Sequence, residues 1–290
     1  MVVFVVLHYM AFEETKACVR SILKNVRGEK KVVVVDNASP NKSYEMLERE
    51  FSAEKDVVLV ASKRNVGFAN GNNLGYAYSI EHFHPDFVVV MNNDMDIQQE
   101  NFIEEIYKSY DAYKFFVCGP DIYATKKKYH QNPQTRKVLK KNEYKKLYRK
   151  LWLKNKLSFL LPLKYILLSF LPVKQAERSN YSTRPYVSDV RENLMLHGSC
   201  YIFSPLFINK YPDECFYNKT FMYLEAEILY YRMKKRGEKM LYCPNLKINH
   251  HEDVSTDAAF RKQYKKSVFS IKCLTQSIKV FVELMEENGD

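Results

Sequence analysis

Four short apolar runs recur along the first 100 residues, and each is followed by polar residues. The runs, which are rich in valine, cover residues 2–7, 31–35, 57–60 and 87–91. Continuous apolar runs of β-branched residues are typical of strands that are buried on both faces of a parallel sheet. Stretches with the spacing of amphipathic helices lie between the runs, at roughly 13–24, 43–51 and 74–80. The alternation predicts an α/β domain built from βα units with right-handed crossovers.

Polar residues occupy the positions where the predicted strands end. Asp36 follows the second run, and Asp94 and Asp96 follow the fourth. A Gly/Asn-rich segment at 65–73 is predicted to be a loop that leads into the third helix. In sheets of this kind, ligands bind beyond the carboxyl ends of the strands. The pattern therefore predicts a ligand site that joins these segments.

The rhythm of strands and helices is interrupted after residue 125. Residues 126–190 are rich in Lys and Tyr and then in Leu and Phe, whereas the α/β pattern resumes at 194–203 and ends near residue 248. Apolar residues recur at helical spacing over roughly 258–285, which predicts a helical tail. We expect the first half of an α/β domain, a basic amphipathic insert, the second half, and a tail helix through which chains could associate. The expected boundaries are 1–125, 126–190, 191–257 and 258–290.

Positive charge is concentrated in the insert. The chain has a formal net charge of +11, and residues 126–178 alone contain 16 Lys and Arg against two acidic residues, Glu143 and Glu177. A basic segment of this kind suits a polyanion such as nucleic acid, an anionic lipid or a polyphosphate.

An apolar stretch at 157–173 follows the basic residues. It contains one lysine and two prolines, so it is too short and too interrupted for a membrane-spanning helix. We predict instead that residues 126–178 dock on an anionic membrane surface without crossing it, with basic side chains on the headgroups and apolar side chains partly inserted. The alternative is that the stretch packs on the rest of the domain and that the lysines are only solvated.

The cysteines and the first apolar run bear on the cellular compartment. The six cysteines are scattered without a C-x-x-C pair, so a zinc site is not expected. Residues 1–7 lack a basic start and a small-residue cleavage site, which favours a first strand over a signal peptide. Free thiols and the lack of a leader pattern predict a cytoplasmic protein.

Asp94 and Asp96 form the sharpest candidate for a metal site. Two carboxylates at a strand end make the oxygen-rich environment that Mg²⁺ or Mn²⁺ prefers, and these ions complete their shell with phosphate oxygens. A bare D-x-D is more often a solvated acidic turn, but here Asp36 ends a second predicted strand. His250, beside acidic residues after a later predicted strand, is a candidate further ligand.

Two more segments carry candidate chemistry. The glycines at 65–75 allow close backbone approach to an anion at a helix N-terminus. Their spacing matches neither a P-loop nor a dinucleotide-binding loop, and the ordinary interpretation is a capped turn. Glu225 and Glu227 begin an amphipathic helix, where acidic residues either complement the helix dipole or provide a general base.

In their order along the chain, these motifs resemble glycosyltransferase family 2, in its rhamnosyltransferase-like branch. The matching segments are V-V-D-N-A-S at 34–39, N-V-G-F-A-N-G-N-N-L-G at 65–75, N-N-D-M-D at 92–96, H-G at 197–198, Y-L-E-A-E-I-L-Y-Y-R at 223–232 and H-H-E-D-V-S at 250–255. The resemblance covers nearly the whole chain and leaves out only the insert. It departs from the family at Ala226, where many relatives have Asp or Glu.

The resemblance implies a GT-A fold, a mostly parallel central sheet with flanking helices, in which 1–125 binds the nucleotide sugar and 191–257 binds the acceptor. It implies inverting transfer from a nucleotide-diphosphate sugar to a glycan or a polyprenyl-diphosphate-linked acceptor in cell-surface polysaccharide synthesis. The place of action would be the inner face of the cell membrane, and the cofactor would be Mn²⁺ or Mg²⁺.

The resemblance also implies a role for particular residues. Those implied to contact the nucleotide sugar are His8, Asp36, Arg64, Asn65, Gly67, Asn72, Asn93 and Asp94. Those implied to hold the metal are Asp94, Asp96 and His250. His197 and Gly198 would face the acceptor. If the base of the relatives falls on Ala226, then Glu227 or Glu225 replaces it, or the activity is weak.

Three other functions compete with this interpretation. A nucleotidyltransferase also uses strand-end carboxylates and a metal, but residues 7–10 contain neither the Gly nor the Lys that its first loop needs. A module that binds nucleic acid or another polyanion would suit the basic insert but leaves the acidic strand ends unexplained, so no nucleic-acid partner is expected. A catalytically inactive relative is compatible with Ala226.

Overall fold

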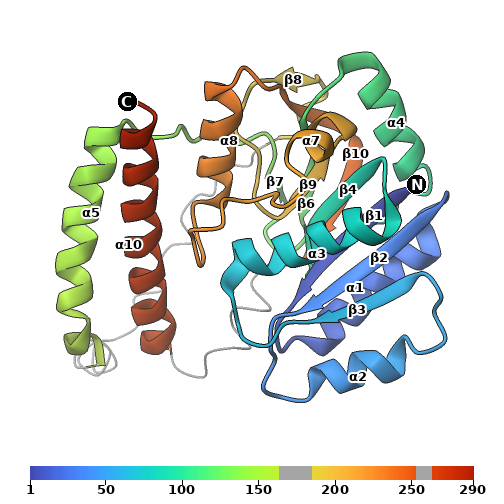
Figure 1. Ribbon diagram of the computed structural model, residues 1–290, viewed down its shortest axis with the longest axis horizontal. Coiled ribbons are helices and arrows are strands. Elements are labelled where there is room, and N and C mark those ends of the chain that lie inside the picture. Colours follow the sequence, from blue (N-terminus) through green and yellow to red (C-terminus); the bar gives the residue numbers. More distant parts are fainter. Residues whose placement is uncertain (163–184, 253–262) are drawn as a thin grey trace.

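The computed structural model describes residues 1–162, 185–252 and 263–290. One sheet runs through the molecule in the strand order β3-β2-β1-β4-β9-β6-β10-β5, and the short strands β7 and β8 pair with β6 and β10 (Figure 1). The strands are β1 (Val2–His8), β2 (Lys30–Asp36), β3 (Val57–Ala61), β4 (Phe87–Asn92), β5 (Met95–Asp96), β6 (Val117–Ala124), β7 (Tyr129–His130), β8 (Arg191–Glu192), β9 (Cys200–Phe203) and β10 (Met240–His250).

The longest ladders of the sheet are parallel. Strand β1 pairs in parallel with β2 and β4, β2 pairs with β3, and β6 pairs with β10. Strand β9 lies antiparallel between β4 and β6. The mostly parallel central sheet predicted from the apolar runs is confirmed, and strands from both expected halves of the domain share it.

Helices cover both faces of this sheet. They are α1 (Phe12–Asn25), α2 (Ser43–Glu50), α3 (Gly67–Phe83), α4 (Phe102–Tyr113), α5 (Lys141–Lys156), α7 (Pro205–Lys210), α8 (Glu225–Lys235) and α10 (Gln263–Glu287), with a 3₁₀ turn, η1, at Ser158–Leu160. Ile22 of α1, Leu47 of α2 and Phe102 of α4 belong to one buried cluster with the sheet. Tyr76 of α3, Phe207 of α7 and Leu229 of α8 belong to the cluster on the other face.

Helix α3 begins seven residues earlier than the sequence predicts, so the prediction of a loop at 65–73 is wrong beyond Val66. The glycines of this segment serve close packing of the helix on the sheet. A Cβ atom on Gly71 would lie 2.6 Å from Cδ1 of Leu7, and one on Gly75 would lie 2.5 Å from Cγ1 of Val5. The helix therefore needs residues without side chains where it crosses β1.

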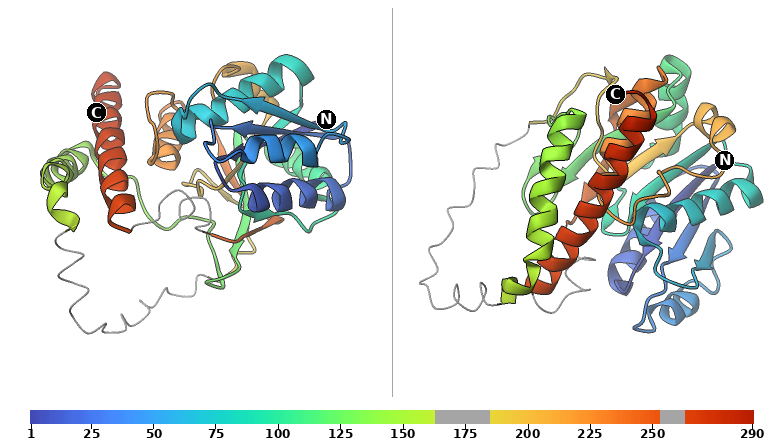
Figure 2. Two further views of the ribbon diagram at one scale, coloured as in Figure 1. Left: turned by 90° about the horizontal axis from the view of Figure 1, so that it is seen from below. Right: turned by 60° about the vertical axis from the view of Figure 1, so that its left-hand side comes forward.

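The insert and the tail form a second layer of helices. Helices α5 and α10 lie side by side in Figures 1 and 2. Tyr144 of α5, Phe281 of α10 and Ile228 of α8 share a buried cluster. In the part of the chain that the structure describes, no helix is long and apolar enough to cross a membrane. Most of the apolar stretch 157–173, Ser255 of the last family motif and the start of the predicted tail lie outside the described residues.

Candidate active site

The carboxyl ends of β1 and β2 meet at His8 and Asp36, which are paired in register. His8 is completely buried, and its ring nitrogens lie 2.7 Å from the hydroxyls of Thr15 and Ser43. Burial lowers the pKa of His8 to about 4, although the nearby carboxylate of Asp36 opposes the change. The neutral imidazole therefore ties the starts of α1 and α2 to the strand ends.

Asp36 and Asn37 organise the loops beside the start of α3. The backbone N–H of Ser39 donates to both carboxylate oxygens of Asp36, at 3.3 and 3.1 Å. The amide of Asn37 donates to Oδ1 of Asn65 and to the carbonyl of Gly67, and its own oxygen accepts from the N–H of Val66. These contacts bring two of the family motifs together.

Gly67 allows the start of α3 to touch the segment before α8. Its φ angle is +86°, and a Cβ atom there would lie 2.1 Å from the carbonyl oxygen of Phe221. The same carbonyl accepts a hydrogen bond from the N–H of Phe68 at 2.6 Å. Because only glycine fits this conformation and this contact, Gly67 couples the two halves of the domain.

Asn72, Asn93 and Arg64, which the resemblance also assigns to the nucleotide sugar, lie in different surroundings. Asn72 is buried within α3 and donates to the carbonyl of Phe68. Asn93 is buried and donates to the hydroxyl of Thr15 at 2.9 Å. Arg64 is exposed on the loop before α3.

Asp94 meets His250 across the sheet. Its Oδ1 lies 3.2 Å from Nε2 of His250, and both residues are buried. Nδ1 of His250 lies 2.7 Å from the amide oxygen of Gln131, which fixes the orientation of the ring. The backbone carbonyl of Asp94 accepts from the N–H of His251, so the end of β10 is held against the D-x-D turn.

Asp96 turns toward other partners. Its Oδ1 lies 2.6 Å from Nε2 of His251, and its Oδ2 accepts from the amides of Gln98 and Asn249. Within residues 1–162, 185–252 and 263–290, no group of three or more His, Cys, Asp or Glu side chains surrounds a common point. Mg²⁺ and Mn²⁺ are commonly held by one or two protein oxygens together with substrate phosphates. The Asp94–His250 pair, with Asp96 two residues further on, suits such an ion.

His197 and Gly198 link this pair to the start of α8. The ring centres of His197 and His250 are 5.9 Å apart, and Nδ1 of His197 lies 2.8 Å from the hydroxyl of Ser199. A Cβ atom placed on Gly198 would lie 3.9 Å from Cβ of Ala226. Residues from three distant motifs thus form one continuous group.

Glu225 stands at the first position of α8 in an unusual environment. Its Oε1 atom is buried and has no hydrogen-bond partner among the described residues. The pKa of Glu225 is raised to about 7, mainly by burial and to a lesser extent by the neighbouring charge of Glu227, although backbone hydrogen bonds oppose the rise. The two preceding residues, Tyr223 and Leu224, have φ angles of +78° and +68°. A non-glycine residue with left-handed backbone angles costs about 1–2 kcal/mol of conformational free energy. The backbone is therefore strained directly before Glu225.

Glu227 has a different environment, although it is only two residues away. It is buried, and its Oε1 lies 3.0 Å from Nη2 of Arg136 in the insert. Arg136 and Gln131 were not predicted as site residues, because each reaches the site from the insert over a long stretch of chain. No local pattern in the sequence marks either residue.

The family model described as glycosyl transferase family 2 matches residues 3–164. The low-salt glycan biosynthesis hexosyltransferase Agl10 of Haloferax volcanii is 29% identical over 118 residues, which make up 41% of this chain and 35% of that protein. The chain thus spans about a third of the length of this curated relative.

Crystal structures of S. aureus TarS share the fold. The structure of TarS 1-349 in complex with UDP has a TM-score of 0.51 and 11% identity, and it covers 86% of this chain and 59% of that one. The complex with UDP-GlcNAc has a TM-score of 0.52 and 11% identity, and it covers 94% of this chain and 65% of that one. At this level of identity the likeness concerns the fold alone, and it agrees with the predicted GT-A architecture.

Proposed function

Because the chain belongs to glycosyl transferase family 2, we propose that it transfers a sugar from a nucleotide-diphosphate sugar to a hydroxyl group of a glycan or a lipid-linked acceptor. The observation that carries this proposal is the group of residues that runs from Asp94 and His250 through His197 and Gly198 to Ala226, the neighbour of Glu225 at the start of α8. It links a candidate diphosphate and metal site to the helix start that carries the carboxylate with the raised pKa.

Glu225 is the proposed general base. A carboxylate with a pKa near 7 is ionised in half of the molecules at neutral pH and is basic enough to accept a proton from a hydroxyl group in the transition state. The acceptor oxygen then forms a bond to the anomeric carbon, the bond from that carbon to the diphosphate breaks, and the proton stays on Glu225. Attack opposite to the leaving group gives inversion.

Glu227, the other candidate base that the sequence leaves open, is the less suitable one. Its Oε1 is engaged by Arg136, so this oxygen is less available to an acceptor hydroxyl. Ala226 fills the position where many relatives carry an acid, and its Cβ points toward Gly198. We propose that Glu225, one residue earlier, takes over the role in this chain.

Asp94, His250 and Asp96 are the residues that would hold Mn²⁺ or Mg²⁺. A divalent ion bound there would offset the negative charge that develops on the diphosphate. Asp36 and the start of α3, with Arg64, Asn65 and Gly67, would face the nucleoside. His8, Asn72 and Asn93 are buried and would act by holding these segments in place.

The nature of the sugar is proposed from the relatives. A hexosyltransferase of glycan biosynthesis and TarS complexes with UDP and UDP-GlcNAc support a hexose carried on UDP, and the motifs support the rhamnosyltransferase-like branch. In this proposal residues 1–125 serve the donor, and residues 191–257 serve the acceptor in cell-surface polysaccharide synthesis. A panel of UDP-, GDP- and dTDP-sugars with Mn²⁺, monitored by thermal shift and donor hydrolysis, tests the donor class.

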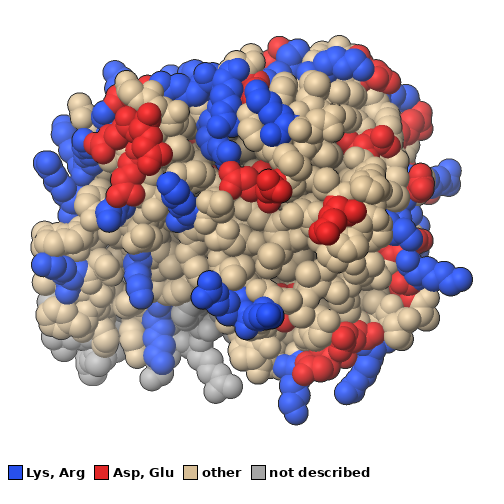
Figure 3. All heavy atoms as spheres, in the orientation of Figure 1, with Lys and Arg blue, Asp and Glu red and all other residues tan. Residues whose placement is uncertain are grey.

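Docking on the inner face of the cell membrane is proposed from the end of α5. This helix buries Tyr144 and Leu151, while Trp152 and Leu153 are exposed. Phe159, just beyond the helix, is 71% exposed. Figure 3 shows basic side chains spaced over α5 and α10, with acidic ones gathered near the C-terminal end of α10. Basic side chains along α5, together with exposed apolar side chains at its C-terminal end, favour binding to an anionic bilayer.

A further inference from the structure

Cross-strand pairing places one row of polar and aromatic residues across four strands. His130 of β7 pairs with Tyr123 of β6, Tyr123 pairs with Asn249 of β10, and Asn249 pairs with Asp96 of β5. Directly paired residues point to the same face of a sheet, and neighbouring strands are spaced at about 4.8 Å. The row therefore runs across about 14 Å of the sheet and ends at the proposed metal site.

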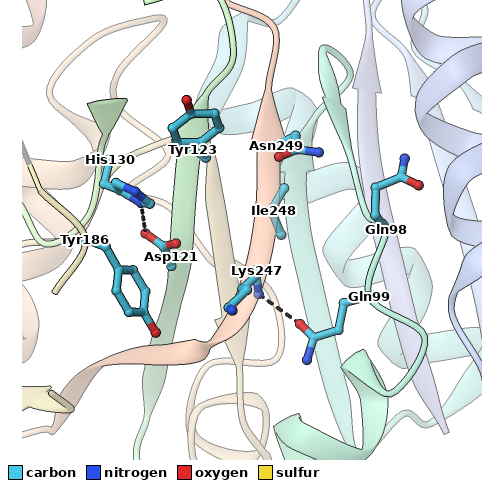
Figure 4. Close-up of a pocket in the computed structure, with 9 residues that line it drawn as sticks. All are labelled: Gln98, Gln99, Asp121, Tyr123, His130, Tyr186, Lys247, Ile248 and Asn249. Carbon is cyan, nitrogen blue, oxygen red and sulfur yellow. Dashed lines mark hydrogen bonds and ion pairs between the residues drawn. The ribbon is translucent and has the colours of Figure 1, made fainter. Parts of the chain in front are cut away.

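A hollow opens over this row. Its volume is about 510 Å³, within the range of about 300–1,000 Å³ that is usual for small-molecule sites. The next row, in which Lys247 pairs with Asp121, also lines it. Figure 4 shows the side chains of Asp121, His130 and Tyr186 together on one side of the hollow, with Lys247 between this group and Gln99.

The polar groups of the hollow retain unused hydrogen-bonding capacity. Asp121 is buried, and its Oδ1 lies 2.7 Å from Nδ1 of His130. The ammonium group of Lys247 makes no hydrogen bond or ion pair with any described residue and lies 5.7 Å from the centre of the Tyr186 ring. Gln98 and Asn249 add amide groups at the edge near Asp96. Both donors and acceptors therefore face the hollow.

Aromatic rings form its apolar part. The ring centre of His130 is 5.1 Å from that of Tyr123 and 5.5 Å from that of Tyr186. Such rings offer broad apolar faces with a polar group at the edge. A ligand for this hollow must therefore combine an apolar face with many hydroxyl groups that both donate and accept hydrogen bonds.

A pyranose ring has this chemistry. We propose that the hollow is a saccharide-binding subsite, in which hydroxyls donate to Asp121 and accept from Lys247, and in which the C–H face of the sugar packs on a tyrosine. Oδ2 of Asp96 accepts from Gln98 and Asn249, so the subsite borders the proposed metal site. Insofar as the proposed glycosyl transfer holds, the bound sugar is a unit of the acceptor glycan.

Saturation-transfer difference NMR with the methyl glycosides of glucose, galactose, mannose, rhamnose and N-acetylglucosamine tests the subsite. At least one glycoside should give signals with the full chain. Asp121→Asn and Lys247→Gln should each weaken its binding about tenfold or more, because each removes a hydrogen bond to a charged group. Lys247 is exposed, so its replacement leaves the fold intact even if Asp121→Asn does not.

Asp94→Asn is the matched control, because Asp94 does not line the hollow. Glycoside signals that survive Asp94→Asn and disappear in Lys247→Gln support the subsite. No signal from any glycoside, or signals that Lys247→Gln leaves unchanged, would overturn it. The NMR samples contain no nucleotide sugar, so this outcome is separate from that of a transfer assay. If the chain binds a glycoside here but transfers no sugar, the subsite is supported and the proposed function is refuted.

Discussion

Nε2 of His250 lies 3.2 Å from Oδ1 of Asp94, although 156 residues separate them in the sequence. The contact exists because β5 pairs antiparallel with the end of β10, which brings the D-x-D turn beside the last family motif. Gln131 holds the other ring nitrogen of His250. The geometry leaves Asp94 and Asp96 with different partners.

We expect Asp94→Asn to weaken divalent-dependent binding of nucleoside diphosphates more than Asp96→Asn does. Asp94 contacts the buried His250, whereas Asp96 is already engaged by His251 and two amides. Isothermal titration of UDP, GDP and dTDP, with Mn²⁺ and with chelator, measures the effect. Equal affinity of the wild type and both variants under both conditions would show that no metal site lies here.

Glu227 and Arg136 should couple in stability. Arg136→Gln leaves the buried Glu227 carboxylate without this partner and should lower the free energy of unfolding by about 1–2 kcal/mol, a value reduced because the Arg136 side chain is 60% exposed. Adding Glu227→Gln should recover part of the loss. Urea unfolding of the two single variants and the double variant measures the coupling, and strictly additive losses would refute it.

Gly75→Ala should destabilise the chain by about 1–3 kcal/mol through overpacking. The new Cβ would lie 2.5 and 2.7 Å from methyl groups of Val5 and Val35, which are fixed on adjacent strands. Gly71→Ala is the matched comparison and should cost less, because its contacts shorter than 3.4 Å are with the flexible end of the Leu7 side chain. Urea unfolding distinguishes them, and a Gly75→Ala variant as stable as the wild type would contradict the close helix packing.

Vesicle co-sedimentation tests membrane docking. Binding should need anionic lipid and weaken with salt. It should fall in Trp152→Ala and in the double change Lys146→Glu and Lys150→Glu. Lys24→Glu changes an exposed charge on α1, on the far side of the sheet from α5, and should leave binding unchanged (Figure 1). Partitioning into neutral vesicles alone, or equal losses in all variants, would reject docking through α5.

The sequence predicted the strands well, because valine-rich runs leave little alternative to a buried strand. It predicted the positions of Asp36, Asp94 and His250 at strand ends for the same reason. It placed the start of α3 too late, because glycines that allow close helix packing have the same composition as glycines in a loop. Arg136 and Gln131 were missed, since their contacts depend on how the insert folds back on the sheet.

The choice between Glu225 and Glu227 also lay beyond the sequence. Both acids occupy the first turn of α8, where either would complement the helix dipole. Only the fold shows that one is paired with Arg136 and that the other has a buried oxygen without a described partner.

The transfer rate of Glu225→Gln, measured against Glu227→Gln from pH 5 to 9 with the donor identified in the nucleotide-sugar panel, tests whether Glu225 is the general base. In the wild type the rate should rise with pH and level off above about 7, because only the ionised Glu225 accepts the acceptor proton and its pKa is about 7. Glu225→Gln should keep donor binding and lose about 10²–10⁴-fold in rate, while Glu227→Gln should keep both the rate and the inflection. Full transfer by Glu225→Gln, or loss confined to Glu227→Gln, would contradict the account.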